Sequence, residues 1–333
     1  MYKFYKFLFF NTLMLGTLIS ISAYSWFSMW LGLEINLISI IPLFNSKKNC
    51  FPSESALKYF LTQTMASSII LFAIISVLNT HEIFIFNHNI FLNSALLTKL
   101  GAAPFHYWFP EIIEGLNWIN NLLILTWQKI APMILIFYTI KINDFFIFVI
   151  ISSSIVGSLL GLNQISMRKI LAFSSINHIG WMLASMIISS SIWMIYFLFY
   201  SLITLSMTMF FKNFNIFFIT QLINKSSPNK IYNLIFYMIF FSLGGLPPFL
   251  GFLPKWMTIL HLNTQNLYFL SLILIIFTLI TLFFYLRICF SALIYSYEET
   301  IPIILNQVSF SWWMIYSMNL TGLPICSLLF SFF

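Results

Sequence analysis

The sequence predicts an all-α, polytopic transmembrane bundle of about eleven helices, two of them discontinuous and related as an inverted repeat. Of the 333 residues, 60% are hydrophobic and 7% charged, with a mean hydropathy of +0.95, which is far above the apolar share of a soluble domain. The apolar residues form continuous rather than alternating runs. Such runs favour helices, because backbone in lipid must satisfy its hydrogen bonds within each span.

The apolar runs, divided at polar or Pro/Gly-rich clusters, have about the length that crosses a bilayer as a helix. In chain order, the predicted spans cover approximately residues 3–22, 25–44, 57–79, 90–116, 119–140, 145–163, 169–190, 192–212, 231–260, 266–294 and 306–331. Lys3 and Lys6 lead into the first run, and no small-residue cleavage site follows it. We therefore interpret the N-terminus as the first helix and not as a cleaved presequence.

The charges favour one orientation in the membrane. With an odd number of spans the termini lie on opposite sides, and cations gather on the inner side of a membrane protein. Of the 15 Lys and Arg, eleven fall on the N-terminal side, one (Lys141) on the other, and three (Lys99, Lys129 and Lys255) inside spans. We therefore attribute the net charge of +7 to the orientation of the chain in the membrane. The cations form no patch or stripe, so we expect no nucleic-acid partner.

The fourth and ninth spans carry one motif, G-x-x-P-F-x-x-(W/F)-x-P, which begins at Gly101 and again at Gly245, an offset of 144 residues. Proline removes a helical hydrogen bond and clashes with the preceding turn, so we expect both helices to be interrupted near mid-membrane. Because the copies lie five spans apart, they cross in opposite directions, as in inverted repeats whose broken helix ends interact with transported ions. Prolines that only kink their helices are the alternative.

We expect a single integral membrane domain over residues 1–333. Its half-repeats cover about 1–140 and 145–294, and a C-terminal helix follows over 306–331.

Four ionisable residues inside predicted spans are candidates for function: Glu34 in the second span, Lys99 before the first interruption, Lys129 in the fifth span and Lys255 after the second interruption. A central charge costs about 2.5 to 3.5 kcal/mol on insertion scales, so such residues mark ion pathways by default. Burial disfavours the charged form of a lysine and a nearby carboxylate favours it, so movement of Glu34 would switch Lys99 between holding and releasing a proton. Charges that only lock helices together are the alternative, and Lys255 has a stem long enough to reach the interface.

Two histidines are further candidates for proton relay, because histidine exchanges protons near neutral pH. His106 follows the first interruption and His178 lies in the seventh span. For each, a polar contact between helices is an equally good interpretation.

No cofactor or metal site is expected in this chain. Cys50, Cys289 and Cys326 lie far apart without a CxxC pair, so neither a disulfide framework nor the four thiolates of an iron–sulfur cluster can be assembled. The sequence has no phosphate loop, zinc spacing, nucleophile elbow or dinucleotide fingerprint. The chemistry that remains is charge movement.

Four stretches resemble the antiporter-like membrane subunits of respiratory complex I, and the resemblance covers nearly the whole chain. They are LTKLGAAPFH over 97–106, WQKIAP over 127–132, SSINHIGWM over 174–182, and GGLPPF continuing to PKW over 244–256. The resemblance implies a proton-pumping module in the mitochondrial inner membrane, driven by electron transfer from NADH to ubiquinone. It also implies that the N-terminus lies on the matrix side and the C-terminus on the intermembrane-space side.

The resemblance further implies a role for each buried charge. The family's glutamate matching Glu34 pairs with the lysine matching Lys99, the residue matching Lys129 belongs to a central hydrophilic axis, and that matching Lys255 lies toward the proton exit. NADH, FMN, iron–sulfur clusters and ubiquinone are then bound elsewhere in the complex, whose NADH:ubiquinone reductase activity this chain serves without a redox site of its own. The implied partners are other membrane-arm subunits, including other antiporter-like ones, and the lipid bilayer.

Bacterial members of the family have additional N-terminal helices, so the resemblance implies a surface that partner subunits cover. Two alternatives stay open from the residues alone. A free-standing cation/proton antiporter would share the broken helices and buried lysines, and a structural spacer would use the buried charges only to hold helices together.

Overall fold

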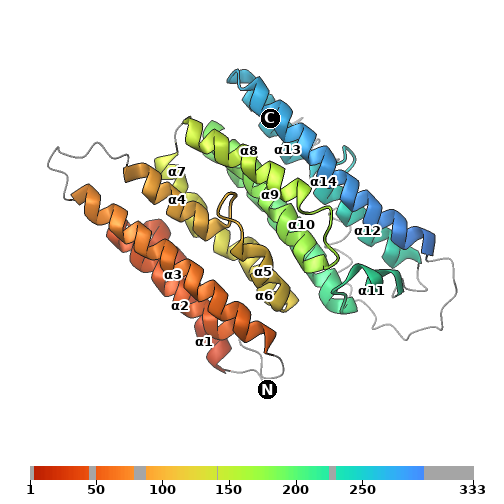
Figure 1. The fold of residues 1–333 in the computed structure, drawn as a ribbon, viewed down its shortest axis with the longest axis horizontal. Coiled ribbons are helices and arrows are strands. Elements are labelled where there is room, and N and C mark those ends of the chain that lie inside the picture. Colours follow the sequence, from red (N-terminus) through yellow and green to blue (C-terminus); the bar gives the residue numbers. More distant parts are fainter. Residues whose placement is uncertain (1–3, 45–49, 79–87, 141, 225–229, 296–333) are drawn as a thin grey trace, which may run out of the picture. The chain divides into compact units, whose positions relative to one another are not determined.

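A computed structural model of the chain describes residues 4–44, 50–78, 88–140, 142–224 and 230–295. Within these ranges the named elements are helices, α1 to α14 and one π-helix, η1 (Figure 1). The prediction of an all-α fold is confirmed for this part of the chain. The chain divides into two compact units, residues 1–146 and 147–333.

In the first unit most of the packed helices are close to one another in chain order. α1 packs on α2, α2 on α3, α3 on α4 and α5, and α4 on α7. The backbones of α1 and α2 approach closely, because a Cβ on Gly32 would lie 2.6 Å from the Ser20 nitrogen. This close packing fixes the helix that carries Glu34. The bounds are α1 (Phe4–Ser22), α2 (Trp26–Phe44), α3 (Phe51–Leu78), α4 (His88–Leu100), α5 (Trp108–Gly115), α6 (Trp118–Leu122), η1 (Leu123–Trp127) and α7 (Gln128–Thr139).

The second unit surrounds α9, which packs against α10, α13 and α14. In its most apolar stretch α9 is 94% buried, so this helix is the centre of the unit. Small residues allow α8 to approach it, because a Cβ on Gly157 would lie 2.6 Å from the Asn177 nitrogen. α8 begins at the end of the first unit, and the bounds are α8 (Asp144–Leu159), α9 (Met167–Ile188), α10 (Ser190–Phe214), α11 (Ile219–Asn224), α12 (Lys230–Gly244), α13 (Phe252–Thr264) and α14 (Tyr268–Tyr295).

Among the described residues, seven helical stretches are long and apolar enough to cross a membrane: Phe4–Ser22, Trp26–Phe44, Phe51–Val77, Trp118–Thr139, Met167–Ile188, Ser190–Phe214 and Tyr268–Phe290. Each falls on one predicted span. Two other predicted spans, 90–116 and 231–260, coincide with the helix pairs α4/α5 and α12/α13, and 145–163 coincides with the shorter apolar helix α8. The predicted helix 306–331 lies outside the described residues, so the count of eleven stays a prediction.

Candidate functional site

The two copies of the repeated motif form the same backbone turn. α4 ends at Leu100 and α12 at Gly244. The following residues, Gly101 and Gly245, have positive φ angles of 75° and 80°, which glycine adopts at little steric cost. In both turns the N–H groups of the glycine and of the next residue donate to carbonyls three and five residues back, at 3.1 to 3.2 Å. This pattern is the Schellman motif, a common helix C-terminus.

The prolines of the motif stand beside these helix ends, where the sequence places the interruptions: Pro104 and Pro248 follow the last helical residues by four positions and have no N–H to continue the helical bonding. Pro104 and Pro248 lie in the connections between helices, beyond the glycine turns. Pro110 and Pro254 are the third residues of α5 and α13, where a backbone N–H has no partner within the helix and proline is tolerated. The repeated glycine therefore ends each helix, and a repeated proline lies in the first turn of the next.

Different side chains meet the carbonyl ends of α4 and α12. The indole N–H of Trp108 donates to the Thr98 carbonyl at 3.0 Å. At the second end, Lys255 Nζ donates to the carbonyls of Gly244 at 2.9 Å and Leu243 at 3.3 Å. Lys255 is only 6% exposed, so its stem does not extend to solvent. A cation is favoured at this position, because the C-terminus of a helix carries partial negative charge.

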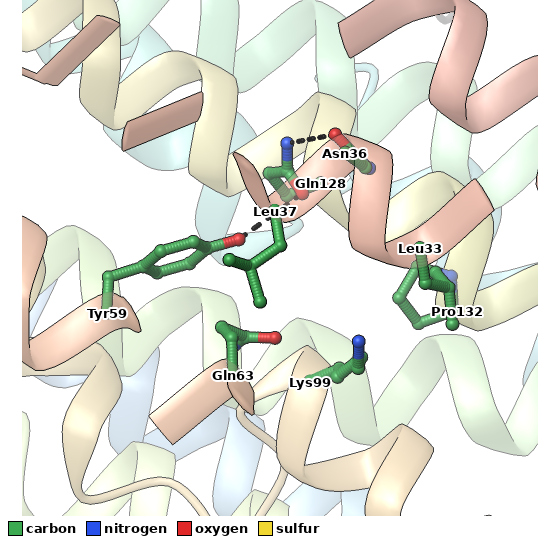
Figure 2. A pocket seen from close by; sticks show the side chains of 8 residues that line it. All are labelled: Leu33, Asn36, Leu37, Tyr59, Gln63, Lys99, Gln128 and Pro132. Atoms are coloured by element: carbon green, nitrogen blue, oxygen red, sulfur yellow. Dashed lines mark hydrogen bonds between the residues drawn. The ribbon is translucent and has the colours of Figure 1, made fainter. Parts of the chain in front are cut away.

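Lys99 lies in the last turn of α4 and is 8% exposed. Its ammonium faces a small cavity whose polar walls are the side chains of Asn36, Tyr59, Gln63 and Gln128 (Figure 2). The cavity has a volume of about 10 Å³, the lower limit for one water molecule. Within the described part of the chain, Lys99 Nζ makes no hydrogen bond to a protein group, although polar side chains line the cavity that it faces.

Glu34 is half-buried on α2. Its carboxylate acts electrostatically on Lys99, but the described residues show no ion pair between the two within 4.0 Å. The ion pairs that the structure does show join Lys58 to Glu54 and to Glu111, both at 3.1 Å and all with exposed side chains. Glu34 and Lys99 therefore form no direct ion pair in the described part of the chain.

Lys129 is the most deeply buried of the three lysines, at 1% exposure. It is the second residue of α7, directly after the π-helix η1. Its ammonium lies 5.6 Å from the centroid of the Phe109 ring, within the range of a cation–π interaction. Single π-helical turns inside α-helices are rare and are often found at functional sites, and this one immediately precedes the lysine.

The two candidate histidines have different surroundings. His106 lies between α4 and α5, is 7% exposed, and its buried Nδ1 has no hydrogen-bond partner among the described residues. His178 on α9 is 6% exposed, and its Nδ1 is hydrogen-bonded to the Tyr196 hydroxyl at 2.9 Å. The Tyr200 ring lies 5.2 Å from the His178 ring, centroid to centroid. A buried histidine with a hydroxyl partner has a group that can donate or accept as the ring changes protonation.

The structure brings Glu34, Lys99 and Lys129 into the first unit, and His178 and Lys255 into the second. Sequence reasoning missed the neutral side chains of the site: Asn36, Tyr59, Gln63, Gln128 and Tyr196. The signal available for two of them is spacing, since Tyr59 and Gln63 are four residues apart and so share one face of α3. In the described residues, no group of three or more His, Cys, Asp or Glu side chains is arranged to hold a metal ion.

Comparison with known proteins gives consistent matches along the chain. The family described as NADH:quinone oxidoreductase/Mrp antiporter, TM, matches residues 23–281. NADH-ubiquinone oxidoreductase chain 2 of Anopheles gambiae is 52% identical over 297 residues, 86% of this chain and 85% of that protein. The protein of the same name from Locusta migratoria is 43% identical over 329 residues, 97% of this chain and 93% of that protein.

Solved structures show the same fold at lower identity. A chain of respiratory complex I from Thermus thermophilus superposes with a TM-score of 0.82 at 21% identity, covering 97% of this chain and 80% of that chain. A chain of the Mrp complex from a Dietzia species gives a TM-score of 0.71 at 16% identity, covering 83% of this chain and 58% of that chain. The chain therefore belongs to the NADH:quinone oxidoreductase/Mrp antiporter transmembrane family, and within it to the NADH-ubiquinone oxidoreductase chain 2 group.

Proposed function

We propose that this chain is the proton-translocating, antiporter-like core subunit of the membrane arm of respiratory complex I, in the mitochondrial inner membrane. The observation that carries the proposal is the burial of Lys99, Lys129 and Lys255 at 8%, 1% and 6% exposure inside an apolar helical bundle. Ionisable groups buried in this way are costly in free energy, and in membrane proteins they mark ion pathways and proton relays. The curated relatives are named as chains of NADH-ubiquinone oxidoreductase.

The proposal includes the finer architecture. The helix pairs α4/α5 and α12/α13 each form one discontinuous crossing, and the two crossings are related as an inverted repeat. The identical glycine turns at Gly101 and Gly245 support this arrangement. With eleven crossings, the N-terminus lies on the matrix side and the C-terminus on the intermembrane-space side, which follows from the distribution of cations.

Proton movement in this proposal uses three lysines in turn. Glu34 sets how firmly Lys99 holds its proton, Lys129 accepts the proton in the core, and Lys255 passes it toward the exit. His106 and His178 are secondary relay groups. Carrying one charge against 100 mV requires about 2.3 kcal/mol, an amount that a modest change in the distance between a carboxylate and a buried ammonium supplies.

The chain binds no redox cofactor or metal in this proposal. NADH, FMN, iron–sulfur clusters and ubiquinone belong to other subunits, and electron transfer there drives the proton steps here. The partners are the other membrane-arm subunits, including other antiporter-like ones, together with the lipid bilayer, and nucleic acid is not a partner.

Replacing Lys129 by methionine tests the proposal. Methionine keeps the length of the side chain without a proton-accepting nitrogen, so we expect Lys129→Met to lower NADH-driven proton pumping of the assembled complex by about tenfold or more. Pumping is measured in vesicles containing the purified complex. Lys212→Met is the matched control, because Lys212 is an exposed lysine in the last turn of α10.

The control must pump like the unaltered complex. If Lys129→Met also assembles and pumps fully, Lys129 has no relay role, and the alternative of a structural spacer subunit replaces the proposal.

A further inference from the structure

The side-chain amide of Gln128 joins three helices at the wall of the Lys99 cavity. Gln128 Nε2 donates to Asn36 Oδ1 on α2 at 2.9 Å, and Gln128 Oε1 accepts from the Tyr59 hydroxyl on α3 at 3.4 Å. Figure 2 shows both bonds converging on Gln128 from the helices on either side of the cavity. The amide is thereby held in one orientation, because its donor and its acceptor have different partners.

These bonds lie in a place where polar groups are costly to leave unpaired. Asn36 is 3% exposed and Tyr59 is 4% exposed. A buried polar atom that loses its partner costs about 1 to 3 kcal/mol, so the three side chains are interdependent. The packing of the helices does not require these three polar side chains, because apolar residues of similar size would fill the same space without the cost of unpaired polar atoms.

Gln128 also adjoins the other lysine of this unit along the chain. It is the first residue of α7, and Lys129 is the second. The preceding residues form η1, and Pro132 inside α7 has no N–H to donate to the Gln128 carbonyl. The backbone at this point therefore lacks the regular α-helical bonding that elsewhere holds a helix in register. The side-chain bonds of Gln128 replace part of that restraint.

We propose that Gln128 is a positioning residue for proton transfer, which by bonding to Asn36 and Tyr59 keeps the start of α7, and with it Lys129, in register with the cavity that Lys99 faces. The inference rests on the proposed function. Gln128 neither gains nor loses a proton. The proton leaves the Lys99 ammonium, which becomes a neutral amine, and it is taken up by the neutral amine of Lys129. In this proposal a water molecule carries the proton away from Lys99, and the cavity that Lys99 faces is at the lower limit of the volume that holds one.

The test uses the assembled complex with Gln128→Met, which keeps the side-chain length and removes both hydrogen bonds. We expect NADH:ubiquinone turnover coupled to pumping to fall by at least about fivefold, because one hydrogen bond corresponds to roughly a fivefold change in rate and the variant loses two. We also expect the ratio of rates in H₂O and D₂O to increase, because proton transfer then limits turnover. A purely structural role would lower the amount of complex without changing this ratio.

Asn120→Leu is the matched control. Asn120 lies on α6 of the same helical stretch and donates from Nδ2 to the Leu43 carbonyl of α2 at 3.2 Å, so it also ties this stretch to α2, but it does not line the cavity. We expect its isotope ratio to remain that of the unaltered complex. Equal behaviour of the two variants, or an unchanged isotope ratio in Gln128→Met, overturns the proposal.

A swap keeps the proposal testable if Gln128→Met does not assemble. Gln128→Asn shortens one side of the bond to Asn36, and Asn36→Gln lengthens the other. The double variant Asn36→Gln/Gln128→Asn is expected to regain most of the turnover that Gln128→Asn alone loses, and failure to regain it overturns the proposal. Lys129→Met measured in parallel separates the two proposals. If it pumps fully, the proposed function fails, whereas if it is inactive and Gln128→Met is normal, only the role of Gln128 fails.

Discussion

Lys99 and Glu34 form no ion pair among the described residues. The carboxylate acts electrostatically on the ammonium, while a small polar cavity, and not a counterion, lies directly in front of Lys99 Nζ. A direct ion pair in an apolar bundle would hold its proton tightly, because removing one partner leaves a buried unpaired charge. Because the carboxylate is not in contact with the ammonium, the proton on Lys99 is held less tightly than in a direct ion pair. The geometry suits a group that must release its proton in each cycle.

The mutation Glu34→Gln tests this coupling at the level of one charge. Removing the carboxylate changes the balance between charged and neutral Lys99, so we expect the pH dependence of coupled turnover to move by about one pH unit. The measurement is NADH:ubiquinone turnover of the assembled complex across a pH series. Glu54→Gln, which removes an exposed carboxylate paired with Lys58, is the control and leaves the pH dependence unchanged. An unchanged profile in Glu34→Gln as well argues against coupling.

At the scale of the helix, the end of α12 depends on two neighbouring glycines in different ways. Gly244 is the last helical residue, and a Cβ there would meet the Leu282 side chain at an ordinary 3.5 Å. Gly245 has φ +80°, and a Cβ there would lie 2.9 Å from Lys255 Cδ and 3.0 Å from its Nζ. The glycine that forms the turn therefore also leaves the space through which Lys255 reaches the helix end.

Replacing Gly244 or Gly245 by alanine distinguishes the role of the glycine turn from that of the last helical residue. Gly245→Ala places a side chain in a left-handed conformation at a cost of about 1 to 3 kcal/mol, and it also crowds Lys255. We expect less assembled complex, measured by native gel, and lower pumping per complex. Gly244→Ala adds a methyl group at a helical position where alanine is favoured over glycine by up to about 1 kcal/mol, so assembly and pumping remain normal. Equal results from the two variants would contradict the role assigned to the turn.

At the scale of the molecule, the sequence was sufficient to predict the helical bundle and its buried lysines. Lys129 stands out from sequence because a charge in an apolar run is costly wherever it lies. Gln128 does not stand out, because neutral amides commonly bond between transmembrane helices. α4 ends inside the predicted span 90–116, but the sequence did not show that Gly101 turns the chain there with a positive φ angle. Short α11 carried no apolar periodicity long enough to predict.

A further prediction concerns the molecule's state in the membrane. Large apolar side chains are exposed along its helices, among them Phe7 at 67% and Leu18 at 60% on α1, which is typical of a surface covered by lipid or by other membrane subunits. After mild detergent extraction, we expect the chain to migrate with the other complex I subunits on native gels. A chain that migrates alone and exchanges cations for protons in liposomes without NADH would instead be a free-standing antiporter.

The two helix ends described above are closed by side chains of different chemical kinds. Trp108 presents an indole N–H whose charge is the same at every physiological pH, so the end of α4 meets a constant partner. Lys255 presents an amine that is a cation or neutral according to whether a proton is bound. Loss of that proton weakens the attraction at the end of α12 and leaves the end of α4 unaffected. The proton on Lys255 therefore affects the attraction at the end of α12, whereas the indole of Trp108 gives the end of α4 a partner of constant charge.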